Sequence, residues 1–283
     1  MQAGQTVLTH RADATIVATD TFVLMKVPAP AGLEGLVLDV ALYRETSGAA
    51  TRQVESASLT VPLIIGFGEP FKIAIGRQPT ANDAYGSFTS GLSLKPVNIA
   101  SVGRCSCLQI NFTPLGARRF FGVTMSALTQ QMIRLDELEV PSLLRLRQRL
   151  GEESDWDRRL ELAEALLIER LGDGAKPSTT AEWAYHRLLG TRGMLPVERL
   201  AREVDWSRKH LAARFREEIG LPPKQVARIA RFVHANALAT SNAATGWADI
   251  AAACGYADQS HLAREFREFA GATPTAWLDA AER

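Results

Sequence analysis

The 283-residue sequence predicts an α+β protein, with a β-rich N-terminal domain and an all-α C-terminal domain. Short apolar segments rich in β-branched and aromatic residues, separated by Pro, Gly, Asn and Asp, fill the chain to about Phe112. After Pro114, apolar residues recur at helical spacing. The segment GDGAKP at 172–177 has no apolar anchor and reads as a linker, and only helices are expected after it.

The expected strands are short and are separated by turn residues. They are TFVLMKV (21–27), GLVLDVALY (35–43), ASLTVPLIIGF (57–67), FKIAI (71–75) and CLQINF (107–112). Several short strands joined by turns favour a barrel or a sandwich. Its aromatic residues, including Phe22, Phe67, Phe71 and Phe88, either form the core or line a pocket.

Two helical segments are expected before the linker. The first is LGARRFFGVTMSALTQQMIRLDEL at 115–138. The second runs from about Asp155 to Leu171, and its apolar stripe must be buried either within the domain or against a second subunit. The stripe consists of Trp156, Leu160, Ala163, Leu167 and Leu171. We therefore divide the chain into a β-rich regulatory domain (1–135), a helical dimerisation or linker region (136–177) and a C-terminal domain (178–283).

Composition limits the classes of protein that the sequence allows. No run of about 18 apolar residues is present to span a membrane, and the first residues lack the pattern of a signal peptide. We therefore expect a cytoplasmic protein. Cys105, Cys107 and Cys254 cannot all pair, and we expect reduced core thiols. Residues 1–175 carry 17 basic and 19 acidic side chains and residues 176–283 carry 15 and 12, a lean too small to indicate a nucleic-acid partner alone.

Two C-terminal segments follow the same plan. In the first, Pro196 opens a helix, a tight turn forms at Asp205, and Ser207 can cap a second helix. In the second, Gly255 makes the turn and Asp258 can cap the following helix. The small residues needed where the paired helices cross are Ala201 and Ala251. Each segment therefore predicts a helix-turn-helix.

A helix that begins at Pro222 and Pro223 and continues to about Leu238 is expected between these segments. At 1.5 Å per residue, roughly 16 residues span about 24 Å. Such a helix can hold two reading heads at a fixed separation. Two heads on one face of a duplex should occupy major grooves about 34 Å apart.

The C-terminal part resembles the DNA-binding domain of the AraC/XylS family of transcription regulators. The resemblance is carried by WADIAAACGYADQSHLAREFREFAGATPTAW, from Trp247 to Trp277, and by LPVERLAREVDWSRKHLAARFREEIGLPPKQVARIARFVHA before it, at 195–235. It implies an N-terminal domain, often a cupin-like barrel, that senses a small molecule or forms a homodimer. It also implies binding to double-stranded operator DNA, activation through RNA polymerase, and no cofactor.

Helical periodicity identifies the residues of the second segment that would face DNA. With Leu262 inward, a rotation of about 100° per residue turns one polar and basic arc outward, and the family's second recognition helix places its contacts at three of the same positions. The predicted DNA-binding residues here are Gln259, Ser260, His261, Arg264 and Arg267. Arg can read guanine and Gln can read adenine, while either Arg can instead hold phosphate. Glu265 and Glu268 are expected on the flanks of this arc.

The same phase argument, with Leu211 inward, applies to the first segment. Its predicted DNA-binding residues are Arg208, Lys209, Ala212, Ala213 and Arg216. Family members often carry larger side chains at the positions of the two alanines. Because Ala can contact a thymine methyl group but donates no hydrogen bond, the second segment should contribute more of the sequence discrimination.

Two alternatives remain open at the level of sequence. The N-terminal domain of a regulator can lack a small-molecule ligand and only dimerise or bind a protein. Alternatively, the chain is a small-molecule carrier or an enzyme with a vestigial helical tail. A metal enzyme on a barrel needs clustered His and carboxylate ligands, but His10 is the only histidine before residue 186. We expect no metal site and no catalytic residues.

Overall fold

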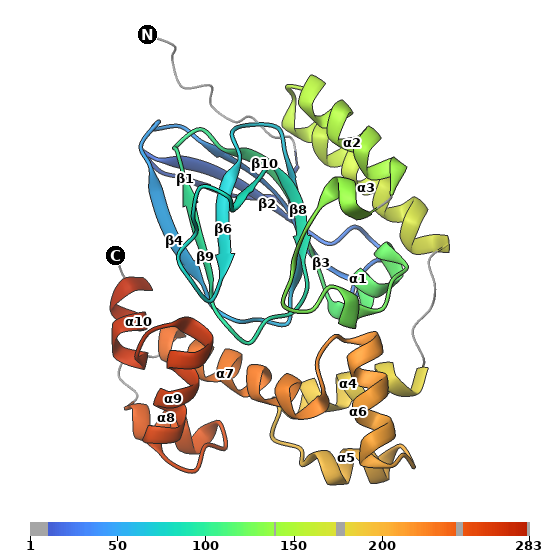
Figure 1. Cartoon of the computed structure of the whole chain (residues 1–283), viewed down its shortest axis with the longest axis vertical. Helices are drawn as coiled ribbons and strands as arrows, with labels where there is room; N and C mark the ends of the chain where they lie inside the picture. Colours follow the sequence, from blue (N-terminus) through green and yellow to red (C-terminus); the bar gives the residue numbers. More distant parts are fainter. Residues whose placement is uncertain (1–10, 139, 174–178, 242–245, 282–283) are drawn as a thin grey trace.

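The computed structural model describes residues 11–138, 140–173, 179–241 and 246–281. A β-rich N-terminal domain lies against an all-helical C-terminal domain, which confirms the predicted α+β class (Figure 1). The strands are β1 (Thr15–Ala18), β2 (Phe22–Pro28), β3 (Val37–Glu45), β4 (Thr51–Glu55), β5 (Val61–Gly66), β6 (Phe71–Ile75), β7 (Ala84–Tyr85), β8 (Ser87–Ser90), β9 (Val97–Ser101), β10 (Ser106–Phe112) and β11 (Met132–Arg134).

The N-terminal strands form two sheets with antiparallel pairing. One has seven strands in the order β1-β2-β3-β10-β5-β8-β11, and the other has four in the order β4-β9-β6-β7. Each of the five expected segments contains a strand, namely β2, β3, β5, β6 and β10. The remaining strands lie in segments for which the sequence pattern predicted none.

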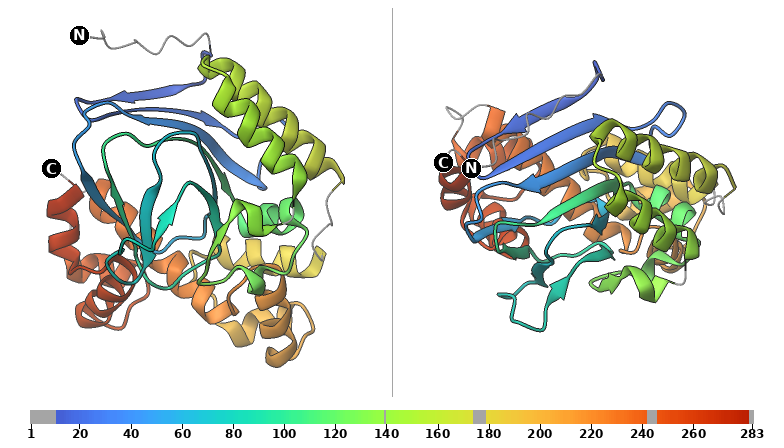
Figure 2. Two further views of the ribbon diagram at one scale, coloured as in Figure 1. Left: turned by 45° about the horizontal axis from the view of Figure 1, so that its top comes forward. Right: turned by 90° about the horizontal axis from the view of Figure 1, so that it is seen from above.

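Alternation along β10 gives the seven-stranded sheet two different faces. Leu108, Ile110 and Phe112 are buried in the main core on the side of helices α1 (Pro114–Phe121), α2 (Pro141–Glu152) and α3 (Trp156–Asp173). Cys107 and Gln109 point to the opposite face and line a cavity between the two sheets. Figure 2 shows α2 and α3 along the outside of the large sheet. One face of the large sheet thus packs against the helices, and the other face lines the cavity.

The expected continuous helix at 115–138 is wrong. Helix α1 ends at Phe121 because Gly122 adopts a left-handed conformation with φ of 71° and closes the helix. A short 3-10 helix, η1 (Met125–Ala127), follows, and β11 then joins the large sheet beside β8 before a second 3-10 helix, η2 (Leu135–Leu138). Apolar residues at helical spacing here belong to four different elements, which periodicity alone does not separate.

The apolar stripe of α3 packs within the chain. All five of its residues are buried, and α3 contacts α1 and α2. The sequence left open whether the stripe is buried within the domain or against a second subunit. These side chains are buried within the domain. The expected linker is shorter at its start, because Gly172 and Asp173 belong to α3, while residues 174–178 lie outside the described residues.

The described part of the C-terminal region after residue 178 contains only helices, as expected. They are α4 (Thr179–Gly190), α5 (Val197–Glu203), α6 (Arg208–Glu218), α7 (Pro223–Ser241), α8 (Trp247–Ala253), α9 (Gln259–Ala270) and α10 (Pro274–Ala281). The three cysteines are free and buried, as predicted. Among the described helices, none combines the length and the apolar character needed to cross a bilayer.

Gly116 provides a test of how α1 packs on the N-terminal domain. A Cβ atom at this position would lie 1.9 Å from the carbonyl oxygen of Leu36, so we expect Gly116→Ala to lower the free energy of unfolding by roughly 1–3 kcal/mol. Thermal and urea denaturation measure this loss. Gly190→Ala is the matched control, because a Cβ there meets no atom within 4 Å. Equal stability of the two variants would contradict the close packing of α1.

Candidate nucleic-acid interface

The second helix-turn-helix, here called the second head, consists of α8, a turn and α9. Gly255 makes the turn with φ of 71°, and the Asp258 side chain accepts a hydrogen bond of 2.7 Å from the His261 backbone N–H. Both features confirm the sequence prediction. Phe266 packs edge-on against Phe232 of α7 and Trp247 of α8, with ring centroids 4.9 and 5.6 Å apart. These contacts fix which side of α9 faces inward.

The outward side of α9 carries most of the predicted DNA-binding residues. Gln259, Ser260, Arg264 and Arg267 are exposed. Within the described part of the chain, neither Arg264 nor Arg267 forms an ion pair. Their guanidinium groups are therefore available to an acidic partner. His261 differs, because its ring is half-buried and lies perpendicular to the Tyr256 ring at 5.2 Å.

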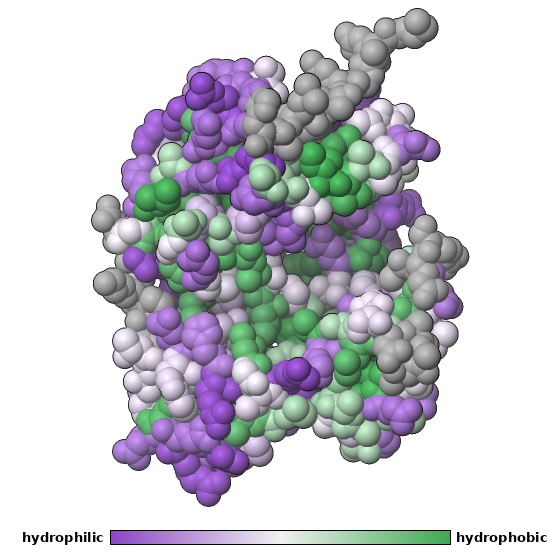
Figure 3. Space-filling view, turned by 180° about the vertical axis from the view of Figure 1, so that it is seen from behind, coloured by the Kyte–Doolittle hydropathy of each residue, from purple (hydrophilic) through white to green (hydrophobic). Residues whose placement is uncertain are grey.

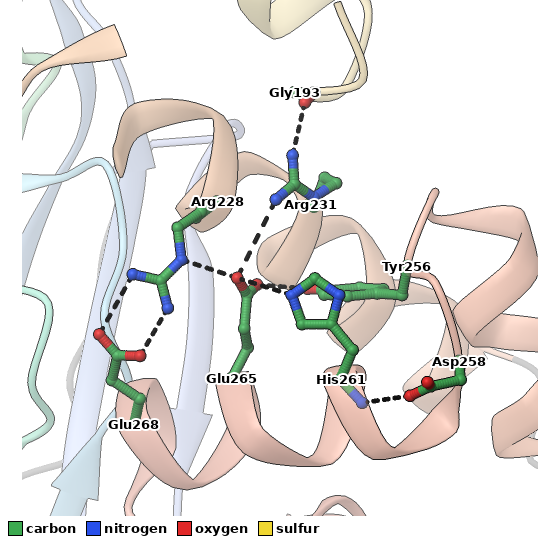
Figure 4. A network of polar contacts seen from close by, with 8 residues as sticks. All are labelled: Gly193, Arg228, Arg231, Tyr256, Asp258, His261, Glu265 and Glu268. Atoms are coloured by element: carbon green, nitrogen blue, oxygen red, sulfur yellow. Dashed lines mark hydrogen bonds and ion pairs between the residues drawn. The ribbon is translucent and has the colours of Figure 1, made fainter. Parts of the chain in front are cut away.

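The position expected for Glu265 on the flank of this arc is wrong. Its side chain is buried, and its carboxylate accepts hydrogen bonds from Arg228 Nε at 2.7 Å and from the Tyr256 hydroxyl at 3.0 Å (Figure 4). Glu268 remains partly exposed and pairs with the other end of Arg228. A buried carboxylate is stable when it is paired and hydrogen-bonded. Both acidic residues therefore hold α9 on α7, and the exposed arc beside them is more basic than the sequence suggested.

The first helix-turn-helix, here called the first head, consists of α5, a turn and α6. Asp205 takes the left-handed conformation with φ of 52°, and the Ser207 side chain accepts a hydrogen bond of 3.1 Å from the His210 backbone N–H. Both were predicted. Leu211 and Phe215 are fully buried. Figure 3 shows a mostly hydrophilic surface over α5 and α6, at its lower left.

The predicted residues of the first head lie on the outer side of α6. Lys209, Ala213 and Arg216 are exposed, whereas Ala212 is half-buried. Arg208 is exposed and pairs with Glu198 of α5 at 3.2 Å. This pair lies in water, where such contacts contribute little to stability and exchange readily. The first head therefore presents three cationic side chains around two methyl groups.

The C-terminal ends of α6 and α9, the second helix of each head, contact the N-terminal domain. The Thr129 hydroxyl donates to the carbonyl oxygen of Gly220, just beyond α6, at 3.0 Å. The Ala57 backbone N–H donates to the carbonyl oxygen of Phe269, near the end of α9, at 2.8 Å. The predicted DNA-binding residues begin at the opposite ends of both helices. The N-terminal domain thus holds both heads from the side away from the first turns of α6 and α9.

The cavity between the two sheets has a volume of about 620 Å³, which lies within the range of small-molecule sites. Its apolar lining includes Phe22, Phe71 and Phe88, whereas Phe67 lies outside it. Polar groups also face it, and among them Asp39 pairs with Lys26 at 2.9 Å and accepts from Asn111 at 2.7 Å. The sequence pattern predicted the three aromatic residues as pocket or core but gave no indication of the polar ones.

Two helix-turn-helix units on one connecting helix, with exposed cationic residues on both second helices, define a double-headed DNA-binding protein. Residues 200–280 match the family model described as a helix-turn-helix domain. The match covers the part of the chain that resembles the AraC/XylS family and shows that this part is a helix-turn-helix domain.

Solved structures with a similar course of the chain have low sequence identity to it. ToxT from Vibrio cholerae is 11% identical over 82% of this chain and 98% of its own, with a TM-score of 0.45. The xylose-binding transcription activator XylR is 23% identical over 39% of this chain and 30% of its own, with a TM-score of 0.32. The AraC-like transcriptional activator CuxR is 13% identical over 77% and 81%, with a TM-score of 0.33. A search of curated proteins found no match.

The two heads are expected to differ in what they contribute to binding. Arg264→Ala should relax the preference at one base position, where a bidentate contact contributes about 1–3 kcal/mol of discrimination. Lys209→Ala should weaken binding to all sequences alike and reduce the salt slope by about 1. Affinities across a library of sites at several salt concentrations measure both effects.

Arg158→Ala is the charge-matched control, because this exposed arginine lies on α3 of the other domain. Equal relaxation of base preference in Arg264→Ala and Lys209→Ala would contradict the division of roles.

Proposed function

We propose that this regulator binds a two-part operator in double-stranded DNA, with α6 and α9 in successive major grooves and the second head as the main reader of bases. The observation that carries this proposal is the exposure of Arg264 and Arg267 beside Gln259, with no ion pair to either arginine in the described part of the chain. Guanidinium groups held close to a groove can pair with guanine N7 and O6. In the first head, Ala212 and Ala213 can contact DNA only through their methyl groups, so the neighbouring cationic side chains supply the polar contacts.

We also propose that a small molecule binds in the cavity of the N-terminal domain and modulates DNA binding. The lining favours a ligand with an apolar body that packs on Phe22, Phe71 and Phe88. Gln109 and Asn111 offer hydrogen bonds to a polar group on such a ligand. Asp39 is already held by Lys26 and Asn111, so the Lys26–Asp39 pair is not expected to select a charged ligand by itself.

A short physical path connects this cavity to the second head. Ala57 lines the cavity, and its backbone N–H binds the carbonyl oxygen of Phe269 near the end of α9. Pro96, between the cavity-lining residues Lys95 and Val97, lies beside Gly271, where a Cβ atom would approach Pro96 Cγ to 3.3 Å. A ligand that moves either segment changes the support of α9. This path favours the ligand-dependent regulator over one whose N-terminal domain only dimerises or binds a protein.

Three further parts of the proposal rest on properties that are common in the family. The protein acts in the cytoplasm, it activates transcription by recruiting RNA polymerase, and it functions as a homodimer. Because the apolar stripe of α3 is buried within the chain, dimerisation requires other surfaces of the 136–177 region or of the two-sheet N-terminal domain. The family consists of transcription regulators rather than enzymes, which argues against an enzyme or carrier with a vestigial tail.

Selection of binding sites from random DNA tests the DNA-binding proposal. We expect two recovered boxes about one helical turn apart, with more information in the box read by the second head. Binding should weaken steeply with salt, because released counterions supply much of the affinity. Absence of any sequence preference at moderate salt would refute the operator-binding proposal.

Thermal melting in the presence of a metabolite panel tests the ligand proposal. A compound that binds only the folded protein stabilises it by about 2.7 kcal/mol at 100 times its dissociation constant, so its melting temperature should rise. Ala41→Phe should abolish this rise because Ala41 lines the cavity and a larger side chain fills it. Ala31→Phe, at an exposed turn, should keep it. A ligand-induced rise that persists in Ala41→Phe would place the ligand elsewhere.

A further inference from the structure

A network of polar contacts lies between the two heads on one side of α7 (Figure 4). At its centre the buried carboxylate of Glu265 accepts hydrogen bonds from Arg228 on α7 and from Tyr256 in the turn before α9. Burial, together with the nearby carboxylate, raises the pKa of the Tyr256 hydroxyl, so this group stays protonated and donates. Glu265 therefore ties α9 to α7.

Arg231 extends this network to the other head. One terminal nitrogen, Nη2, lies 4.0 Å from Glu265 Oε1. The other, Nη1, donates a hydrogen bond of 2.9 Å to the carbonyl oxygen of Gly193, in the turn that leads from α4 into α5 of the first head. A single side chain on α7 thus contacts the second head and the turn that leads into the first head.

The turn that holds Gly193 is fixed against α7. Gly193 has φ of 73°, and a Cβ atom there would lie 2.1 Å from the carbonyl oxygen of Ala227. Its neighbour Met194 packs beside Gly255, because a Cβ on Gly255 would approach Met194 Cγ to 3.4 Å. The turn between α4 and α5 therefore lies directly beside the turn of the second head, and Arg231 joins the two at a second point.

These contacts have a geometric consequence for DNA recognition. A helix alone fixes the distance between two attached heads, but rotation of one head about its contact with the helix alters where its recognition helix points. From Arg231 and Glu265 we infer that the pair forms an inter-head bridge, a set of positioning residues that determines which spacing between two DNA boxes the regulator accepts. This inference rests on the proposed two-part operator.

Arg228 supplies a control within the same network. It lies three residues before Arg231 on α7 and binds the same Glu265 at 2.7 Å, but its other contact is Glu268 of α9. Among the described residues, its polar contacts thus stay within α7 and the second head. Loss of Arg228 should loosen α9 on α7, whereas loss of Arg231 should also release the first head.

The experiment measures affinity for duplexes that carry both boxes, with the spacer shortened or lengthened one base pair at a time, and for a duplex with the second-head box alone. Each base pair changes the separation by about 3.4 Å and the rotation by roughly 35°. We expect the wild-type protein to favour one spacing sharply. In Arg231→Met the preference for that spacing over its neighbours should fall by at least about fivefold, the lower range of measured coupling between sites.

The single-box duplex separates positioning from general damage. Arg231→Met should bind it with the wild-type base preference, and Arg228→Met should lose affinity equally at all spacings. Arg231→Lys, which keeps the charge near Glu265 but lacks a second arm for Gly193, should behave like Arg231→Met while retaining the fold by circular dichroism. This variant keeps the test informative if Arg231→Met does not fold.

The outcomes distinguish a failure of the inter-head bridge from a failure of the proposed operator binding. A wild-type spacing profile in both Arg231 variants, with only a uniform loss of affinity, would show a structural role and overturn the bridge. A flat spacing profile in the wild-type protein would overturn the bridge but leave sequence-specific binding intact. A wild-type protein without preference among sequences would overturn the proposed function and the bridge with it.

Discussion

The packing of both heads on α7 is the interaction on which the C-terminal domain depends. Helices α5 and α8 have seven residues each, and helices this short are not stable in water alone. Helix α7 contacts α4 and α6 on the side of the first head and α8 and α9 on the side of the second. Phe232 lies within 5.4 Å of the rings of Phe266 and Phe269, measured between centroids. Both heads therefore pack on the same helix. The orientation of each head depends on its contacts with α7.

The parts of the heads that the sequence predicted depend on neighbours in the chain. Ser207 and Asp258 cap helices through backbone groups three residues away, and Asp205 and Gly255 make turns that their own conformational preferences allow. The position of Glu265 could not be predicted in this way. Its partners Tyr256 and Arg228 come from 9 and 37 residues away, and helical phase alone does not reveal that such a partner exists.

The N-terminal domain was predicted less completely, for related reasons. Strand β5 is apolar on both sides, one facing the helices and one facing the space between the sheets, and its composition identified it. Strand β4 reads TRQVE and is largely exposed, so its pattern resembles a loop. The cavity itself depends on how far apart two sheets stand, which no local pattern encodes. Gln109 and Asn111 face that space only because β10 lies at the centre of the large sheet.

The hydrogen bond from Ala57 to Phe269 joins two backbone groups of the same chain and involves no side-chain atom. Substitutions that reshape the cavity wall, other than proline at position 57, leave both the donor and the acceptor in place. Side chains that line the cavity can therefore change while the link to α9 is kept. The exposed arc of α9 can likewise change without loss of this link, because the link uses only a backbone carbonyl near the end of the helix.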